Sequence, residues 1–359
     1  MKHLAFCLTF VLSMIAPAIF GQIEGGNAFL FSPTVEIGID NAGGFEGSSA
    51  LPTFPDHWRA GPAGIGFMAD PEETGWVDYN GCHYLPGYPE NTWGIEISGT
   101  NYLNGYAAGV DIPPTTGLHD YAEVGNCDLV EWDGSVAGVD VSILYKLDVT
   151  TSYYTVDYTI TNTTASTLTN IYTFKSFDPD NNQYIGWGFS TENQVDKQPD
   201  PFCPVSTVHA AQYNDWTSYV GFGAIDPNTR VSRGGFAVTS GSDIYNATGG
   251  LIGDVEMTET SGDQAISISH RTPSLAPGES DNFQCVVILD GTQVEEAILS
   301  LYDIDYEGAD PSLASCEELV ADTVEFDCSD GAIELELTGP YLGPGYEVTW
   351  YNDDTGEEI

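Results

Sequence analysis

The chain has 359 residues and carries 54 acidic side chains against 8 lysines and arginines, a formal net charge of −46 at pH 7. A field this negative repels nucleic acids and anionic membrane surfaces, which excludes both as partners. Hydrophobic residues make up 42% of the chain, enough to build a core, which excludes a disordered chain. The acidity fits either adaptation to a salty medium or the binding of cations.

The first 21 residues have the layout of an export signal. Lys2 precedes an apolar run from residue 4 to residue 20, and small residues follow at its end. The run is too short for a membrane span, and this layout is typical of a cleaved signal peptide. We expect cleavage after Ala18 or Gly21, an extracellular or cell-surface location, and no membrane span in the mature chain.

Three later stretches alternate between apolar and polar residues with a period of two. They begin at Val141, Tyr154 and Phe283. Strict alternation is typical of strands with one face in a core and the other in water. The sequence therefore predicts an all-β protein, an antiparallel β-sandwich of ordinary or enlarged size. The one helix expected covers residues 294–301, where Val294, Ala297, Ile298 and Leu301 share a face.

The mature chain divides into three parts. Residues 22–307 form the large sandwich region, and residue 138 is a candidate boundary inside it, because the residues before it alternate less regularly. Residues 308–315, GADPSLAS, have the composition of a linker. Residues 316–359 hold only three or four short strands, too few to close a sandwich, which predicts an incomplete Ig-like β module.

Six cysteines follow the signal segment. An even number in an exported chain predicts up to three disulfides, and the sequence leaves their pairing open. No C-x-x-C motif is present, so a zinc or redox site has little support. The candidates are Cys82, Cys127, Cys203, Cys285, Cys316 and Cys328, of which the last two are the nearest pair.

An acidic turn is the first candidate metal site. Asp178, Asp180 and Asn182 have the alternating spacing of oxygen ligands in calcium loops. The next residues do not match an EF-hand, which leaves a looser calcium site, or a plain turn whose aspartates cap backbone amides. Asp303 and Asp305 have the same spacing, with a solvated strand end as the alternative.

Four tryptophans are the candidate ligand-binding residues. They lie near turns, beside glycine, asparagine and aspartate, at Trp76, Trp93, Trp187 and Trp216. Exposed rings flanked by amides and carboxylates suit the faces and hydroxyls of sugars. The alternative is that these large rings fill the ends of a β-sandwich. An extracellular polysaccharide is the ligand class that this pattern indicates.

The chain has no recognisable catalytic motif. H-E-x-x-H, G-x-S-x-G and phosphate-binding glycine patterns are absent, and with 54 acids a pair of carboxylates carries no information. In a mutarotase- or glycosidase-like enzyme His209 could act with Glu192, but nothing in the sequence fixes their geometry. We assign no catalytic residue and expect a non-enzymatic role.

A pattern near the end of the chain consists of Cys328, the segment DGAIELELTG at 330–339 and the segment YEVTW at 346–350. Through these residues the C-terminal part of the chain resembles the repeat of SprB-type surface adhesins of gliding bacteria. Earlier segments, YLPGYPENTWGIEISG and LAPGES, resemble modules of secreted bacterial surface proteins. These resemblances imply extracellular display and adhesion, and they bring no catalytic residue.

The expected function is therefore an exported, non-enzymatic adhesive or structural module at the cell surface. Calcium is the one cofactor expected, and the expected partners are extracellular polysaccharide or other cell-surface components. The first alternative is an extracellular carbohydrate-binding module. The second, which the sequence supports less, is a mutarotase- or glycosidase-like enzyme.

Overall fold

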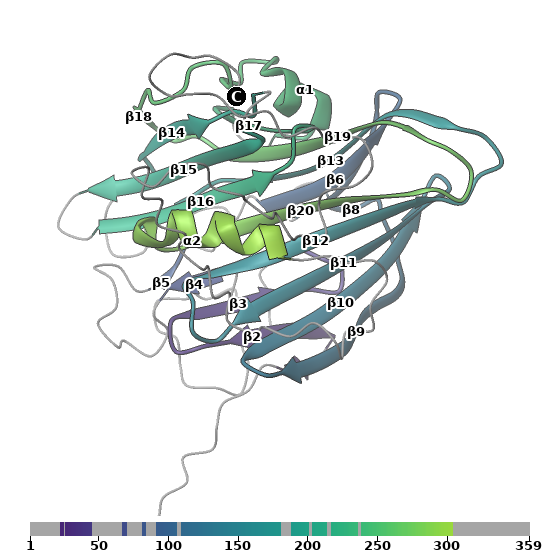
Figure 1. Ribbon diagram of the computed structural model, residues 1–359, viewed down its shortest axis with the longest axis horizontal. Helices are drawn as coiled ribbons and strands as arrows, with labels where there is room; N and C mark the ends of the chain where they lie inside the picture. Colours follow the sequence, from purple (N-terminus) through teal and green to yellow (C-terminus); the bar gives the residue numbers. More distant parts are fainter. Residues whose placement is uncertain are drawn as a thin grey trace, which may run out of the picture.

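A computed structural model of the chain shows an all-β protein built from antiparallel sheets in a sandwich (Figure 1), as predicted. The structure describes residues 22–24, 26–44, 67–69, 81–83, 91–105, 109–180, 188–200, 203–213, 217–235 and 238–303.

The largest sheet has nine strands in the order β18-β14-β15-β16-β20-β12-β11-β10-β9. Its members are β9 (Pro114–Val124), β10 (Cys127–Val136), β11 (Val139–Asp148), β12 (Tyr153–Asn162), β14 (Thr191–Lys197), β15 (Val205–Tyr213), β16 (Thr217–Ile225), β18 (Thr260–Gly262) and β20 (Ser280–Ile288).

A six-stranded sheet packs against it in the order β17-β19-β13-β6-β7-β8, and a smaller sheet of five strands runs from β1 to β5. The six strands are β6 (Asn91–Ile97), β7 (Thr100–Gly105), β8 (Gly109–Val110), β13 (Leu168–Phe177), β17 (Thr229–Arg233) and β19 (Ile266–Leu275). The five are β1 (Gln22–Glu24), β2 (Asn27–Phe31), β3 (Val35–Ile39), β4 (Phe67–Ala69) and β5 (Gly81–Cys82).

The core lies between the sheets and is lined by every second residue of the long strands. Tyr145, Val156 and Cys285 lie on three neighbouring strands, and each of them is 0% exposed. Tyr158 and Phe283 stack with centroids 5.6 Å apart. The three alternating stretches of the sequence are thus strands β11, β12 and β20, each with its apolar face buried, and burial of this apolar area is the main driving force for folding.

Two short helices cover the outer faces of the sheets. The predicted helix is present as α2 (Val294–Leu299), continued by the 3-10 turn η3 (Ser300–Asp303). Its residue Ile298 packs so closely over β16 that a Cβ at Gly223 would lie 2.3 Å from the Ile298 side chain. The sequence did not indicate α1 (Gly241–Asn246), which begins at the cap Ser240. No described helix is long and apolar enough to cross a membrane.

Residue 138 lies in the turn of a β-hairpin. Ala137 and Gly138 have φ values of 50° and 79°, as a tight two-residue turn requires. The strands on either side, β10 and β11, pair over their whole length, and one core cluster draws side chains from both sides of the turn. A domain boundary near residue 138 does not fit this geometry. The expected signal segment, the linker and the C-terminal module lie outside the described residues.

Candidate metal site

Three aspartates meet where strands β13 and β19 leave the six-stranded sheet. Phe177, the last residue of β13, pairs with Ile266, the first of β19. Because the two strands are antiparallel, the residues after Phe177 and those before Ile266 leave the sheet at the same end. A carboxylate oxygen from each of Asp178, Asp180 and Asp263 lies within 4.8 Å of the other two.

Two of these carboxylates are removed from water. Asp178 is 4% exposed and Asp180 is 2% exposed, whereas Asp263 is exposed. The Oδ1 atom of Asp180 is buried and has no hydrogen-bond partner. If the Asp180 carboxylate is ionised, this oxygen has neither water nor a donor beside it, which is costly unless a cation compensates the charge.

The electrostatics of the cluster agree with the geometry. Burial, followed by the negative charges of Asp178 and Asp263, raises the pKa of Asp180 to about 8. Burial also raises the pKa of Asp263. The charges that act on Asp180 are therefore negative, and the site favours any cation that can approach it.

The donor set fits a hard divalent cation. Calcium binds carboxylate and carbonyl oxygens in flexible geometries with six to eight ligands, and three carboxylates supply the charge that such sites use. Two of the three, Asp178 and Asp180, are the residues that the sequence predicts for calcium. Of the other predicted ligands, Asn182, Asp305 and the side chain of Asp303 lie outside the described part of the chain.

Asp263 was not among the predicted ligands. It is the one acidic residue in the segment TSGDQAIS, and no local sequence pattern distinguishes it from the other acids of the chain. Only the pairing of β13 with β19 brings it to the acidic turn, and that pairing joins segments far apart in sequence.

Trp93 is not a surface ligand-binding residue, which corrects the prediction. It is 1% exposed, and its Nε1 donates to the backbone oxygen of Ala42 at 3.0 Å. The alternative, a ring that fills the sandwich, is the correct one for this residue. Trp76, Trp187 and Trp216 lie outside the described residues, so a sugar-binding role for them stays a prediction.

Two of the six candidate disulfide cysteines are not paired. Cys203 and Cys285 carry free thiols, which corrects the prediction for these two, whereas Cys127 is disulfide-bonded. Of the up to three disulfides predicted, at most two remain. Among the six candidate cysteines, the structure does not describe the side chains of Cys82, Cys316 and Cys328.

His209 has a different carboxylate partner from the one considered in the sequence. Its Nδ1 lies 2.8 Å from Oδ2 of Asp196, and its ring stacks on Tyr219 with centroids 5.0 Å apart. The Nε2 atom is buried, and His209 is 8% exposed. His209 is thus packed into the sheet surface beside Asp196 and Tyr219.

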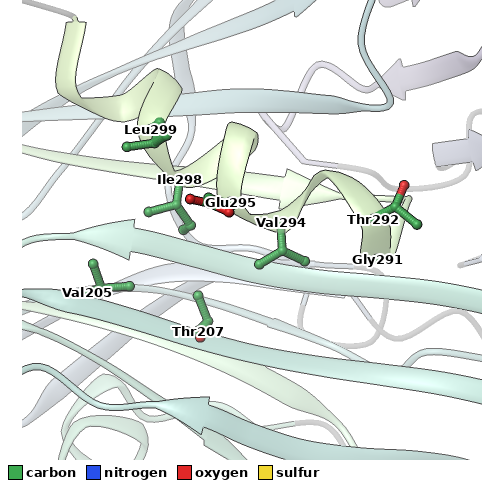
Figure 2. Close-up of a pocket in the computed structure, with 8 residues that line it drawn as sticks. All are labelled: Val205, Thr207, Gly291, Thr292, Val294, Glu295, Ile298 and Leu299. Carbon is green, nitrogen blue, oxygen red and sulfur yellow. The ribbon is translucent and has the colours of Figure 1, made fainter. Parts of the chain in front are cut away.

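A groove lies between α2 and β15. It has a volume of about 550 Å³, and Figure 2 shows Val294 and Ile298 of the helix directed toward Val205 and Thr207 of the strand. Glu295 is the one ionisable side chain among its lining residues. None of the predicted site residues lines it, so the groove and the aspartate cluster are separate features.

Comparisons with known proteins give only weak likenesses. No family model matches the chain, and no curated protein does. Among solved structures, a polysaccharide lyase is 13% identical over 55% of this chain and 25% of its own, with a TM-score of 0.30. A TPR-domain containing protein from Parabacteroides distasonis is 12% identical over 79% and 49%, with a TM-score of 0.36.

A galactose mutarotase-like protein from Clostridium acetobutylicum is 12% identical over 75% of this chain and 97% of its own, with a TM-score of 0.30. The chain spans about a quarter of the length of the lyase and about half of the length of the TPR-domain protein. TM-scores this low carry no argument about what this chain binds or does.

Proposed function

We propose that the chain is an exported, non-catalytic β-sandwich module with an adhesive or structural role, stiffened by a calcium ion at Asp178, Asp180 and Asp263. The observation that carries the proposal is the buried, unpartnered Oδ1 of Asp180 inside a cluster of three carboxylates. A bound cation would give that oxygen the partner that it lacks.

The position of the cluster explains how an ion would stiffen the module. Asp178 and Asp180 follow β13, and Asp263 precedes β19, so one ion would tie together the chain segments at one end of the six-stranded sheet. Because the unfolded chain does not hold these three groups together, binding would favour the folded state. Resistance to unfolding is what a displayed adhesive or structural module requires outside the cell.

The buried histidines support a non-catalytic role. His270 is 3% exposed, stacks on Phe283 and lies 3.1 Å from Asp281. His209 is enclosed in a similar way by Asp196 and Tyr219. A general base must reach the proton that it removes, and these two side chains are held where they support the packing of the sheets.

Thermal unfolding with different cations tests the proposal. The chain without residues 1–21 is melted in EDTA, in magnesium and in calcium at constant ionic strength, together with Asp180→Asn and Asp263→Asn. Glu295→Gln is the control, because it removes one charge from an exposed residue of α2. Calcium at a hundredfold excess over its dissociation constant should stabilise the wild type and the control by about 2.7 kcal/mol.

The two cluster variants should lose this response. An equal response to magnesium, or a calcium response that survives in Asp180→Asn, would show that the cations only screen the net charge of −46, and the proposed function would then lose its support.

A further inference from the structure

A second group of ionisable side chains lies on the outer face of the nine-stranded sheet, on β9 and β10. His119 pairs with Glu131 across the two strands, and Asp133 follows two residues later on the same face of β10. Val130 and Trp132, which alternate with these acids, are buried in the core. The group formed by His119, Asp120, Glu131 and Asp133, here called the His119 cluster, therefore faces away from the core.

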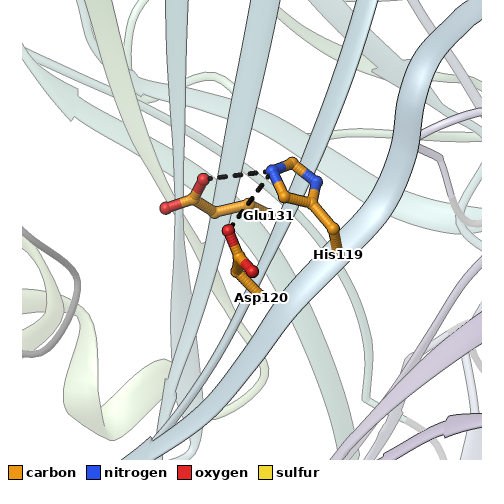
Figure 3. Close-up of side chains that lie close together, drawn as sticks. All are labelled: His119, Asp120 and Glu131. Atoms are coloured by element: carbon orange, nitrogen blue, oxygen red, sulfur yellow. Dashed lines mark ion pairs between the residues drawn. The ribbon is translucent and has the colours of Figure 1, made fainter.

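A β-bulge brings Asp120 into the cluster. Neighbouring residues of a regular strand point to opposite faces, so Asp120 should point away from His119. The pairing shifts here, because the three residues Leu129 to Glu131 of β10 lie opposite the four residues His119 to Ala122 of β9. Asp120 also has a φ of 47°. Bulges redirect side chains in this way, and the Asp120 carboxylate thus approaches the ring of His119 (Figure 3).

The tautomer of His119 is fixed by the backbone. Its Nδ1 lies 2.9 Å from the carbonyl oxygen of Gly117. A carbonyl oxygen only accepts hydrogen bonds, so Nδ1 carries a proton and donates it. In the neutral ring Nε2 then presents its lone pair to the carboxylates, which is repulsive unless a cation lies between them. Histidine ligands of metals usually donate their other N–H to a backbone carbonyl or a carboxylate in this manner.

The distances suit a metal ion better than a proton. Nε2 lies 3.5 Å from an oxygen of Glu131, 3.5 Å from one of Asp133 and 3.7 Å from one of Asp120. These separations exceed the 2.7 to 3.2 Å of an N–H···O hydrogen bond, so a proton on Nε2 has no acceptor at bonding distance. Ligands of a tetrahedral zinc ion, with bonds of about 2.0 to 2.2 Å, are separated by roughly 3.3 to 3.6 Å.

From this geometry we infer that the His119 cluster is a second metal site, for a zinc-type transition metal ion bound by Nε2 of His119 and the carboxylates of Asp120 and Glu131, whose ligand atoms all lie within 4.8 Å of one another. Asp133, 3.5 Å from Nε2, adds a further negative charge beside the site. Imidazole with carboxylates is a donor set for such ions, whereas calcium takes oxygen ligands alone. The site is thus distinct in chemistry from the aspartate cluster at Asp178. It does not depend on the proposed function.

The side chains differ in how freely they can adjust to an ion. His119 and Glu131 are 21% and 19% exposed, and they form the fixed part of the site. Asp120 is 69% exposed and can rotate onto an ion from solvent. Three carboxylates surround a single imidazole in this cluster, an excess of negative charge that a divalent ion would offset.

Calorimetric titration with zinc chloride tests the inference. The chain without residues 1–21 is titrated in 0.15 M sodium chloride with excess magnesium, which occupies non-specific acidic sites. His119→Ala and Glu131→Gln are compared with the wild type, and Glu295→Gln is the matched control. Cobalt(II) serves as a second probe, since a tetrahedral site with nitrogen and oxygen ligands gives it strong visible absorption.

The inference predicts one high-affinity zinc per chain, a tetrahedral cobalt spectrum, and a loss of at least tenfold in zinc affinity in both cluster variants but not in the control. The far-ultraviolet circular dichroism and the urea-unfolding midpoint of metal-free His119→Ala should match those of the metal-free wild type, which shows that the variant is folded. Zinc binding of equal strength in His119→Ala, or no stoichiometric zinc in the wild type, would overturn the inference and identify His119 as an ordinary ion-paired histidine.

Discussion

Trp93 and Trp132 meet edge to face between the sheets, with ring centroids 5.3 Å apart and ring planes at 78°. Their indole nitrogens donate to consecutive carbonyl oxygens, those of Ala42 at 3.0 Å and Asn41 at 2.9 Å. The hydroxyl of Tyr145 donates to the next carbonyl, that of Gly43, at 2.8 Å. Three aromatic donors from β6, β10 and β11 thus hold the turn after β3 against both large sheets.

This turn explains why Gly43 is a glycine, and it gives the first prediction. Gly43 has a φ of +70°, and a Cβ there would lie 2.7 Å from the Trp132 ring. Gly43→Ala should lower the free energy of unfolding by about 2 to 4 kcal/mol, because the clash adds to the backbone strain. The matched control is Gly99→Ala, where φ is +83° and no atom lies within 4 Å of the added Cβ.

Urea unfolding of both variants measures the difference. The control should lose only the strain of about 1 to 2 kcal/mol. Equal losses in the two variants would mean that the contact with Trp132 contributes nothing.

The fold class could be predicted from the sequence because the alternation that begins at Val141, Tyr154 and Phe283 marks strands whose one face is buried. The helix over residues 294–301 was predicted for the same kind of reason. The order of strands could not be predicted, since β20 pairs with β12 and β16 across long stretches of chain. Local patterns do not indicate such long-range pairing.

The same limit applies to the candidate sites. Asp178 and Asp180 are visible in the sequence as an acidic turn, but Asp263 joins them only through the pairing of β13 with β19. The His119 cluster depends on a β-bulge, which no local sequence motif predicts. The turn residues near Trp93 predict a surface ring, yet Trp93 lies on a strand that is buried along its whole length.

A buried carboxyl on β12 gives a prediction about pH. Burial raises the pKa of Asp157 to about 7, although Gln284 and Lys146 lower it in part. The folded chain therefore holds this proton between about pH 4 and pH 7, where the unfolded chain releases it. The contribution of Asp157 to stability is complete below about pH 4 and is lost as the pH rises through about 7, by up to about 1.4 kcal/mol per pH unit.

Asp157→Asn does not titrate, so its stability relative to the wild type should increase from pH 4 to pH 7 and then level off. Chemical unfolding of the two proteins at several pH values measures this, and the remaining acids cancel in the difference. A difference that does not change with pH would contradict the raised pKa.

The two free thiols should differ in reactivity. Cys203 is partly exposed, whereas Cys285 is buried, and burial raises the pKa of the Cys285 thiol to about 12. Since the thiolate is the reactive form, a thiol reagent should label Cys203 in the folded chain and Cys285 only after unfolding. Cys203→Ser should remove one labelled thiol under native conditions, and Cys285→Ser should remove one only in denaturant.

The calcium proposal has a signature that separates a lost site from a damaged fold. Asp180→Asn removes a buried charge that has two negative neighbours. The metal-free variant should therefore be at least as stable as the metal-free wild type at pH 8, while it gains nothing from calcium. A variant that is less stable in EDTA than the wild type would indicate that Asp180 supports the fold in another way.

Calorimetric titration of the metal-free chain with calcium tests the central claim most directly, with wild type and Asp180→Asn compared at the same ionic strength. We expect one calcium ion per wild-type chain, bound in the presence of magnesium, and no stoichiometric binding to the variant. Identical titrations of the two proteins, or none in either, would contradict a calcium site at Asp178, Asp180 and Asp263.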